Sequence, residues 1–136
     1  MITGFACGVF DLYHPGHVLM LKECKEHCDY LVVGLNSCIN LDSSKNAPIY
    51  TIDERFMILS SVKYIDEIVV YNSEEELSNI LSHNKYNVRF LGNDYYNKII
   101  TAKDMIPRII YLNRDHGYST SNLRHKIVKL TKNYNE

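Results

Sequence analysis

The sequence predicts an α/β fold built on a doubly wound, parallel five-stranded sheet, formed by one domain over residues 1–136. Short β-rich runs alternate with amphipathic helical windows along the whole chain, which is the pattern of a βαβ series. Residues 30–35 (YLVVGL) are apolar throughout, as in a strand buried on both faces of a parallel sheet. One domain follows because 136 residues suit a single core, and neither a repeat nor a linker divides them.

Each element follows from a local signal. Proline near its start predicts a first helix over Pro15–Cys28. Thr51-x-x-Glu54 resembles a capping box and opens a helix through Val62, and Ser73-x-x-Glu76 opens the next helix. A short helical stretch is expected near Lys103 and a final helix over residues 121–132. The five β-rich runs predicted as strands are residues 2–7, 30–35, 67–71, 88–91 and 108–112.

Charge and composition exclude several classes of protein. Fifteen Lys and Arg balance sixteen Asp and Glu, so the chain has no bulk positive charge for nucleic acid or anionic lipid. The apolar runs are far shorter than the roughly 18 residues of a membrane helix. Residues 1–20 lack a basic start and contain Asp11, His14 and His17, which does not fit a signal peptide. We therefore expect a cytoplasmic enzyme or binding domain.

Three metal-binding residue types lie close together at Cys24, His27 and Cys28. Thiolates at i and i+4 can share a zinc ion. Both cysteines also continue the helical stripe of His17, Met20 and Leu21, and free cysteine is among the most buried residue types. The pattern favours core packing over a metal site.

The segment GVFDLYHPGH, residues 8–17, follows the first predicted strand. Its two histidines, three residues apart, bracket a Pro-Gly at a helix start, so their rings can lie beside the free amides of that terminus. Imidazoles can donate to phosphate and can become charged near it, and glycine lets a phosphate approach the backbone. The segment supplies the candidate residues Gly8, Val9, Phe10, Asp11, His14, Gly16 and His17.

This segment resembles the HxGH signature of the nucleotidyltransferase superfamily, and its longer form G-x-F-D-x-x-H-x-G-H is similar to the cytidylyltransferases, especially the short glycerol-3-phosphate cytidylyltransferases. Residues 114–121 (RDHGYSTS) resemble the R-x-x-G-x-S-T-T/S segment that precedes the last helix of that family. Capping of that helix is the alternative role for the hydroxyls. The resemblance spans nearly the whole chain and implies a Rossmann-like sheet.

The resemblance carries further positions over from the family. Arg55, in Asp53-Glu54-Arg55, would contact the nucleotide or polyphosphate. Lys45 lies in the loop where the family places lysines for phosphate, although a solvated loop lysine is a close alternative. Gly92-Asn93-Asp94 matches a G-x-D near the nucleoside pocket, where Asp94 has a turn or cap as its alternative role. The remaining phosphate-binding candidates are Arg114, Ser119, Thr120 and Ser121.

The resemblance implies attack by an acceptor phosphate on the α-phosphorus of CTP, with catalysis by His14, His17, Lys45 and Arg114. The expected partners are CTP and a small phosphorylated alcohol, with Mg²⁺ held mainly by the nucleotide. For Asp11, contact with the metal and ordering of the loop both stay open. A homodimer is implied as well. The open alternatives are an adenylyltransferase resembling FAD synthetase, which would use ATP, and a catalytically idle nucleotide-binding domain.

The sequence also departs from the glycerol-3-phosphate pattern. Asp115 and His116 replace the commoner Thr and Glu, and Tyr118 replaces a small aliphatic residue. These changes leave the residues expected for nucleotidyl transfer in place. They leave the identity of the phosphorylated acceptor open.

Overall fold

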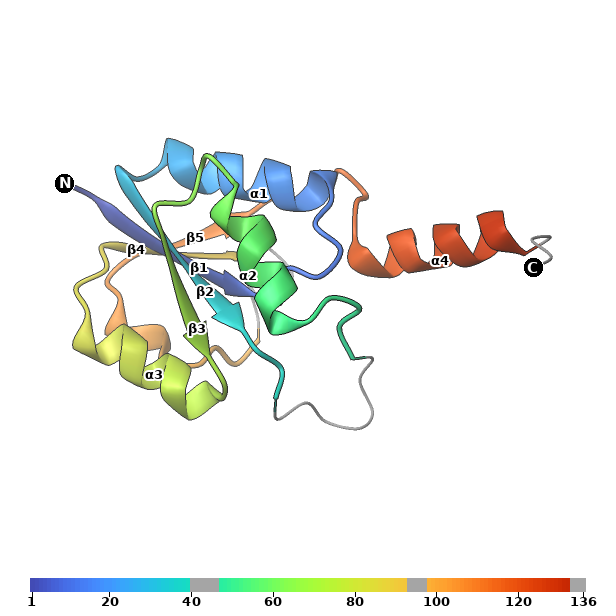
Figure 1. Ribbon diagram of the computed structural model, residues 1–136. Helices are drawn as coiled ribbons and strands as arrows, with labels where there is room; N and C mark the ends of the chain where they lie inside the picture. Colours follow the sequence, from blue (N-terminus) through green and yellow to red (C-terminus); the bar gives the residue numbers. More distant parts are fainter. Residues whose placement is uncertain (40–46, 93–97, 133–136) are drawn as a thin grey trace.

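The computed structural model describes residues 1–39, 47–92 and 98–132 and confirms the predicted α/β fold (Figure 1). All neighbouring strands pair in parallel, in the order β3-β2-β1-β4-β5. Each predicted strand is present, with ends shifted by no more than one residue. The strands are β1 (Thr3–Gly8), β2 (Tyr30–Asn36), β3 (Glu67–Tyr71), β4 (Val88–Gly92) and β5 (Ile109–Leu112).

Helices cover both faces of the sheet. One core contains Leu21 and Cys24 of α1 and Leu59 of α2, and the other contains Leu77 and Leu81 of α3. Cys24 is fully buried in the first core, which confirms packing as its role. The helical elements are α1 (Pro15–Glu26), α2 (Ile52–Ser60), α3 (Glu74–His83), the 3₁₀ turn η2 (Lys103–Met105) and α4 (Thr120–Thr131).

Helices α1 and α2 both end earlier than the sequence predicts, and α1 ends at Glu26 rather than Cys28. Helix α2 stops at Ser60 rather than Val62, because the amides of Ser61 and Val62 donate to carbonyls three residues back and tighten the last turn. The capping box of α2 is complete, whereas that of α3 is half formed. Ser73 accepts from the Glu76 amide, but the Glu76 carboxylate accepts from the amide of Asn72 instead of Ser73.

The strand order reverses between β1 and β4, which are neighbours in the sheet. Ligands of open parallel sheets bind outside the carboxyl ends of the strands at such a point. The segment 8–17 leaves β1 at this edge, β4 ends there at Gly92, and the segment 113–119 follows β5. Helix α4 then runs away from the body of the molecule (Figure 1). Within the described ranges, no helix is long and apolar enough to cross a membrane.

Candidate active site at the start of helix α1

The two histidines of HPGH form a capping box for α1. His14 is the N-cap residue, and its Nδ1 accepts from the Gly16 amide at 3.0 Å. His17, three residues later, returns the bond by accepting from the His14 amide through its own Nδ1 at 3.2 Å. Pro15 occupies the first turn, where its missing N–H costs nothing. The three-residue spacing of the histidines is therefore the spacing of a reciprocal helix cap.

These bonds set the tautomer of both rings. Because each Nδ1 accepts from a backbone amide, the proton of each neutral ring is on Nε2. The His14 Nε2 lies 3.3 Å from Thr120 Oγ1, which in turn donates to the Asp11 carbonyl at 3.3 Å. The two imidazoles stack with ring centres 3.9 Å apart, and Tyr13 stacks on the other ring, that of His17, at 5.5 Å. The pair is thus held rigidly before any ligand arrives.

Both imidazoles are neutral at pH 7 in this structure. Burial, the adjacent imidazole of His14 and the guanidinium of Arg114 lower the pKa of His17 to about 4. Burial, with His116 and Arg114 nearby, also lowers the pKa of His14. A bound polyanion opposes these causes, because it stabilises the protonated rings. An anion beside the two rings would therefore raise both pKa values.

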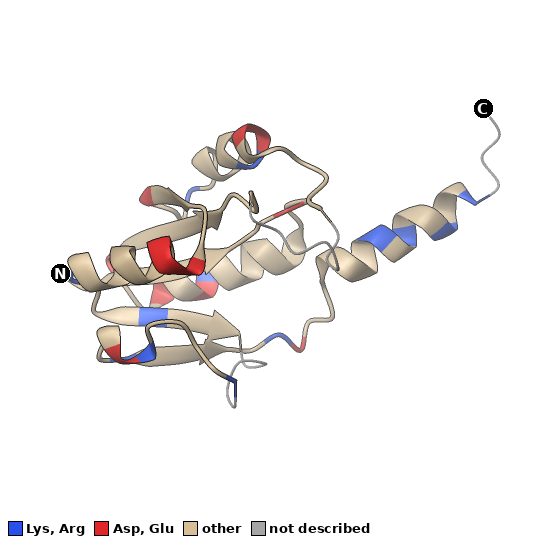
Figure 2. Ribbon diagram, turned by 90° about the horizontal axis from the view of Figure 1, so that it is seen from below, with Lys and Arg blue, Asp and Glu red and all other residues tan. Residues whose placement is uncertain are grey.

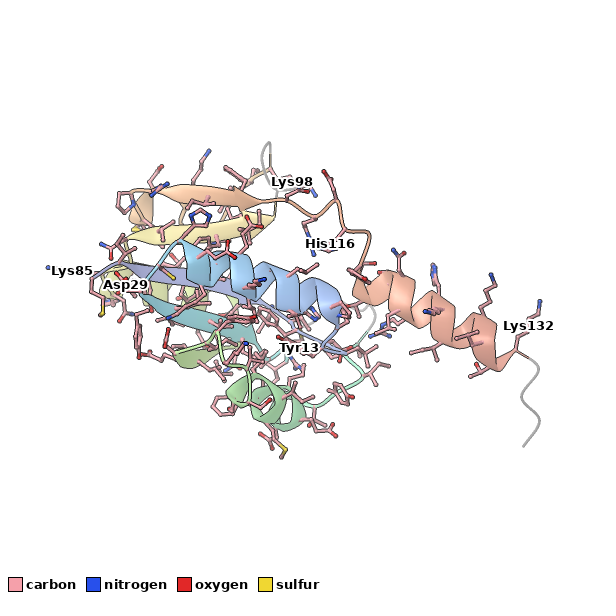
Figure 3. The ribbon with its side chains drawn as sticks, turned by 90° about the horizontal axis from the view of Figure 1, so that it is seen from above. Tyr13, Asp29, Lys85, Lys98, His116 and Lys132 are labelled. Carbon is pink, nitrogen blue, oxygen red and sulfur yellow. The ribbon has the colours of Figure 1, made fainter. Side chains whose placement is uncertain are left out.

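Gly16 is required by packing around the histidine pair. A Cβ at this position would lie 2.8 Å from Cε1 of His14 and 2.9 Å from Cβ of Tyr118. Beside it lies a largely apolar hollow of about 550 Å³, which includes Tyr13, His14 and Tyr118 in its lining. Figure 3 shows Tyr13 and His116 towards the α4 end of the molecule, away from Lys85. The hollow gives a ligand outside α1 access to His14.

Asp11 joins three segments at the edge of the sheet. Its buried carboxylate accepts from the amides of Ile49 and Tyr50, at 2.8 and 3.0 Å, and from Arg124 Nη2 at 3.0 Å. Phe10 and Leu12, on either side of it, both have positive φ, an uncommon conformation for such residues. The hydrogen bonds of Asp11 offset the free-energy cost of this strained backbone. Of the two roles left open for Asp11, the geometry favours ordering of the loop.

The segment 113–119 brings the second motif to the same place. Ser119 is the N-cap of α4 and accepts from the Asn122 amide at 3.0 Å, so the capping role of this serine is real. Gly117 has a φ of 79°, in the left-handed region that favours glycine. Arg114 is exposed and close enough to lower the pKa of both histidines. The structure thus places Thr120 beside His14, with Arg114 close enough to affect both histidines electrostatically.

The comparisons with known proteins agree with this geometry. A family model described as cytidylyltransferase-like matches residues 5–126, which is most of the chain and includes both motifs. The chain belongs to the cytidylyltransferase-like family. It is 34% identical, over 90% of its length and 95% of the relative, to the glycerol-3-phosphate cytidylyltransferase of Bacillus subtilis.

Two other relatives show the breadth of this cytidylyltransferase-like family. The bifunctional protein HldE of Campylobacter jejuni is 30% identical over 90% of this chain, which corresponds to 27% of that longer protein. A lipopolysaccharide core biosynthesis protein of Thermoplasma volcanium has a similar structure, with a TM-score of 0.62 and 26% identity. That match covers 96% of this chain and 88% of the other. The fold and the general class of enzyme are therefore shown, and the acceptor is not.

Arg55, expected at the nucleotide, lies inside the protein. It is 2% exposed and donates to the carbonyls of Val9, Asn36, Ser37 and Tyr50 at 2.6–3.2 Å. These bonds hold the ends of β1 and β2 and the residue before the cap of α2. In this member of the cytidylyltransferase-like family, the guanidinium of Arg55 stabilises the backbone segments next to the site. Its contact with a nucleotide stays a prediction.

Arg124 was missed by the sequence analysis, although it contacts both Asp11 and the Ala47 carbonyl. The available signal was its i+4 spacing from Thr120, which places both side chains on one face of α4. Lys45 and Asp94 lie outside the described residues. Gly8 and Gly92 end β1 and β4, as expected for residues that approach a ligand with their backbone.

Proposed function

We propose that this protein transfers CMP from CTP to a small phosphorylated alcohol such as glycerol 3-phosphate, forming a CDP-alcohol and pyrophosphate. The observation that carries the proposal is the rigid His14–His17 pair at the start of α1, in a chain that aligns over nearly all of a glycerol-3-phosphate cytidylyltransferase. A helix terminus is a suitable place for phosphate, because its amides and dipole favour negative charge.

The reaction needs no general base from the protein. An oxygen of the acceptor phosphate attacks the α-phosphorus of CTP, and the bond from that phosphorus to the bridging oxygen of the β-phosphate breaks. The acceptor is mostly dianionic at neutral pH, since the second pKa of a phosphate monoester is about 6. Catalysis then consists of aligning two polyanions and stabilising the charge that develops between them.

The chain provides the groups for this task. In the proposal His14 and His17 stabilise the α-phosphate, while Arg114 and Lys45 neutralise the departing pyrophosphate. The hydroxyls and amides of Ser119, Thr120 and Ser121 bind phosphate oxygens. One well-placed donor contributes about 3–4 kcal/mol to such a transition state, so several together account for a large part of the acceleration.

The nucleoside lies along the strand ends in this proposal, against the backbone of Gly8, Val9, Phe10 and Gly92 and near Asp94. The hollow beside His14 accepts the part of a substrate that is bonded to the reacting phosphate. Its lining includes the aromatic rings of Tyr13 and Tyr118, which suits the apolar faces of a sugar, an alcohol chain or a base. Tyr118 therefore adds to the selection of the substrate.

In this proposal Mg²⁺ binds to the protein together with CTP. The Asp11 carboxylate already accepts three hydrogen bonds, and among the described residues no cluster of three metal-binding side chains is found. The donor set therefore fits an ion carried mainly by the phosphate oxygens of the nucleotide rather than one held in a protein cage. When bound, it supplies neutralisation of phosphate charge.

Nucleotide choice and turnover test the proposal together. Thermal shifts with CTP, ATP, GTP and UTP, each with Mg²⁺, should be largest for CTP. Release of pyrophosphate should then require both CTP and a phosphorylated alcohol. A higher kcat/KM with ATP would identify an adenylyltransferase instead. Binding of CTP without turnover on any phosphorylated alcohol would identify an idle nucleotide-binding domain.

The acceptor is tested separately at Asp115. In the proposal this residue lies beside the acceptor, so Asp115→Thr should change the ratio of rates between glycerol 3-phosphate and a larger polyol phosphate. CTP affinity, measured by isothermal titration, should stay nearly constant. An unchanged ratio of rates would remove Asp115 from acceptor selection without affecting the assignment of CTP.

A further inference from the structure

Arg124 joins the second turn of α4 to two segments at the edge of the sheet. Its Nη2 donates to the Asp11 carboxylate at 3.0 Å and to the Ala47 carbonyl at 3.1 Å. The ion pair is shielded from water, because the side chain of Asp11 is 5% exposed and that of Arg124 is 27% exposed. A shielded pair is screened less by salt than a surface pair. Arg124 therefore restricts the position of α4 relative to the loop that contains Asp11.

Thr120 links the first turn of α4 to the same loop. Its Oγ1 donates to the Asp11 carbonyl at 3.3 Å and lies 3.3 Å from Nε2 of His14. Residues four apart face the same side of a helix, so Thr120 contacts the backbone of Asp11 while Arg124 contacts its carboxylate. The start of α4 is thus joined to the start of α1 through Asp11 and His14.

These polar contacts are important because apolar packing within the chain holds α4 only weakly. Residues 120–131 are all described, none of them is buried, and every residue from His125 to Thr131 is exposed. Figure 2 shows the helix extending away from the sheet, with Lys and Arg residues along it. A helix of 12 residues is marginal in water without tertiary contacts. The orientation of its first turn therefore depends mainly on Thr120 and Arg124.

We propose that Arg124 is a positioning residue for nucleotidyl transfer, which holds the start of α4 on His14 through Asp11 and Thr120. The hydroxyls and amides at the start of α4 and the imidazoles of α1 then face the same phosphate groups, which is the alignment that the reaction needs. This inference rests on the proposed function. Two protein acceptors already use Nη2 of Arg124, so in the proposal the guanidinium acts on the loop and not on a substrate.

Two variants of Arg124 test this role. Arg124→Met removes the charge and both hydrogen bonds of the side chain but keeps much of its apolar stem. With CTP and glycerol 3-phosphate, kcat should fall by about tenfold or more while KM for CTP changes by less than about threefold, because misaligned groups slow the reaction without weakening binding equally. Arg124→Lys should recover most of the lost kcat, since a single nitrogen makes both contacts and an ammonium can replace it.

A matched control and a measurement without nucleotide separate this contact from the reaction. Lys129→Met removes one positive charge from the exposed outer part of α4 and should leave kcat and KM unchanged. All variants should melt within about 5 °C of the unaltered protein. In the unliganded protein, the amides of Asn122 and Leu123, which donate to Ser119, should exchange their hydrogens about tenfold faster or more in Arg124→Met and at the unaltered rate in Lys129→Met.

Several results would overturn the proposal. It fails if Arg124→Met keeps its kcat, or if the loss is mainly in KM, which would indicate direct contact of the guanidinium with phosphate. It also fails if Lys129→Met has the same effect, or if hydrogen exchange in Arg124→Met is unchanged. If the unaltered protein converts no phosphorylated alcohol, the proposed function fails, and the exchange rates still decide whether Arg124 holds α4 on the loop.

Discussion

The two halves of the candidate site are held in place by different means. The segment 8–17 is tied by reciprocal histidine caps and by Asp11, and both Asp11 and His14 are buried. The segment 113–119 is mostly exposed, and several of its hydrogen bonds are local, such as the one from the Tyr118 amide to Nδ1 of His116. Rigid donors stabilise a transition state without reorganisation. An exposed loop suits recognition. We therefore propose that the first segment mainly stabilises the reacting phosphate, and that the second mainly recognises the substrates, with Arg114 also neutralising the pyrophosphate.

Among substitutions that test this comparison, we expect the largest effect at Asp11. Asp11→Ala leaves the amides of Ile49 and Tyr50 without their acceptor and should lower the free energy of unfolding by about 3–5 kcal/mol. Arg124→Ala keeps both amide bonds and should cost about 1 kcal/mol or less. Urea unfolding of the two variants measures this. Equal losses of unfolding free energy in the two variants would show that the stabilisation by Asp11 comes from its bond to Arg124 and not from its bonds to the two loop amides.

The histidine caps allow folding to be separated from catalysis. His14→Ala should reduce kcat by about 10²-fold and also remove a helix cap worth about 1 kcal/mol. His14→Asn is the matched control, since asparagine caps helices well but lacks an imidazole. It should restore the melting temperature without restoring kcat. Normal turnover in both variants would exclude the proposed role of His14.

Stability should depend on pH through His17. Its folded pKa of about 4 lies below the ordinary value of 6.5, so the unfolded chain binds more protons between these limits. The stabilisation is fully present above about pH 6.5 and is lost as the pH falls towards 4. We expect a loss of about 2 kcal/mol after allowance for partial exposure.

His17→Asn provides the reference for this measurement, because other groups also titrate in the same range. Urea unfolding at several pH values from 4 to 7 should give a shallower dependence for the variant than for the unaltered protein. Two parallel curves would mean that His17 has an ordinary pKa in the folded state.

The smallest effect is expected in the exposed half of the site. Arg114→Lys keeps the positive charge but removes the bidentate fork, so KM for CTP should rise by about tenfold with a smaller change in kcat. Steady-state kinetics with CTP as the varied substrate measure both constants. An unchanged KM would place the triphosphate away from Arg114. It would also contradict the proposal that the segment 113–119 recognises the nucleotide.

The fold was predictable because the alternation of strand and helix signals is local and unbroken. The position of HPGH at a helix start was also predictable, from the strand before it and from Pro15. Its mutual capping was not, since that depends on the rotamers of His14 and His17. The burial of Arg55 escaped prediction because arginine is usually exposed. Three of its four carbonyl partners, those of Val9, Asn36 and Ser37, also come from segments that only the tertiary fold brings to it. Arg124 and Asp11 meet across 113 residues for the same reason.

The helix cap made by HPGH affects how the motif is interpreted in other chains. Since both histidines cap α1 and Gly16 packs against His14, selection for stability favours residues that cap a helix at these positions even after catalysis is lost. The HPGH string in a relative is therefore not sufficient evidence that the relative is catalytically active. Activity is inferred better from positions outside this helix cap, and Arg114 is the first of them to compare between relatives.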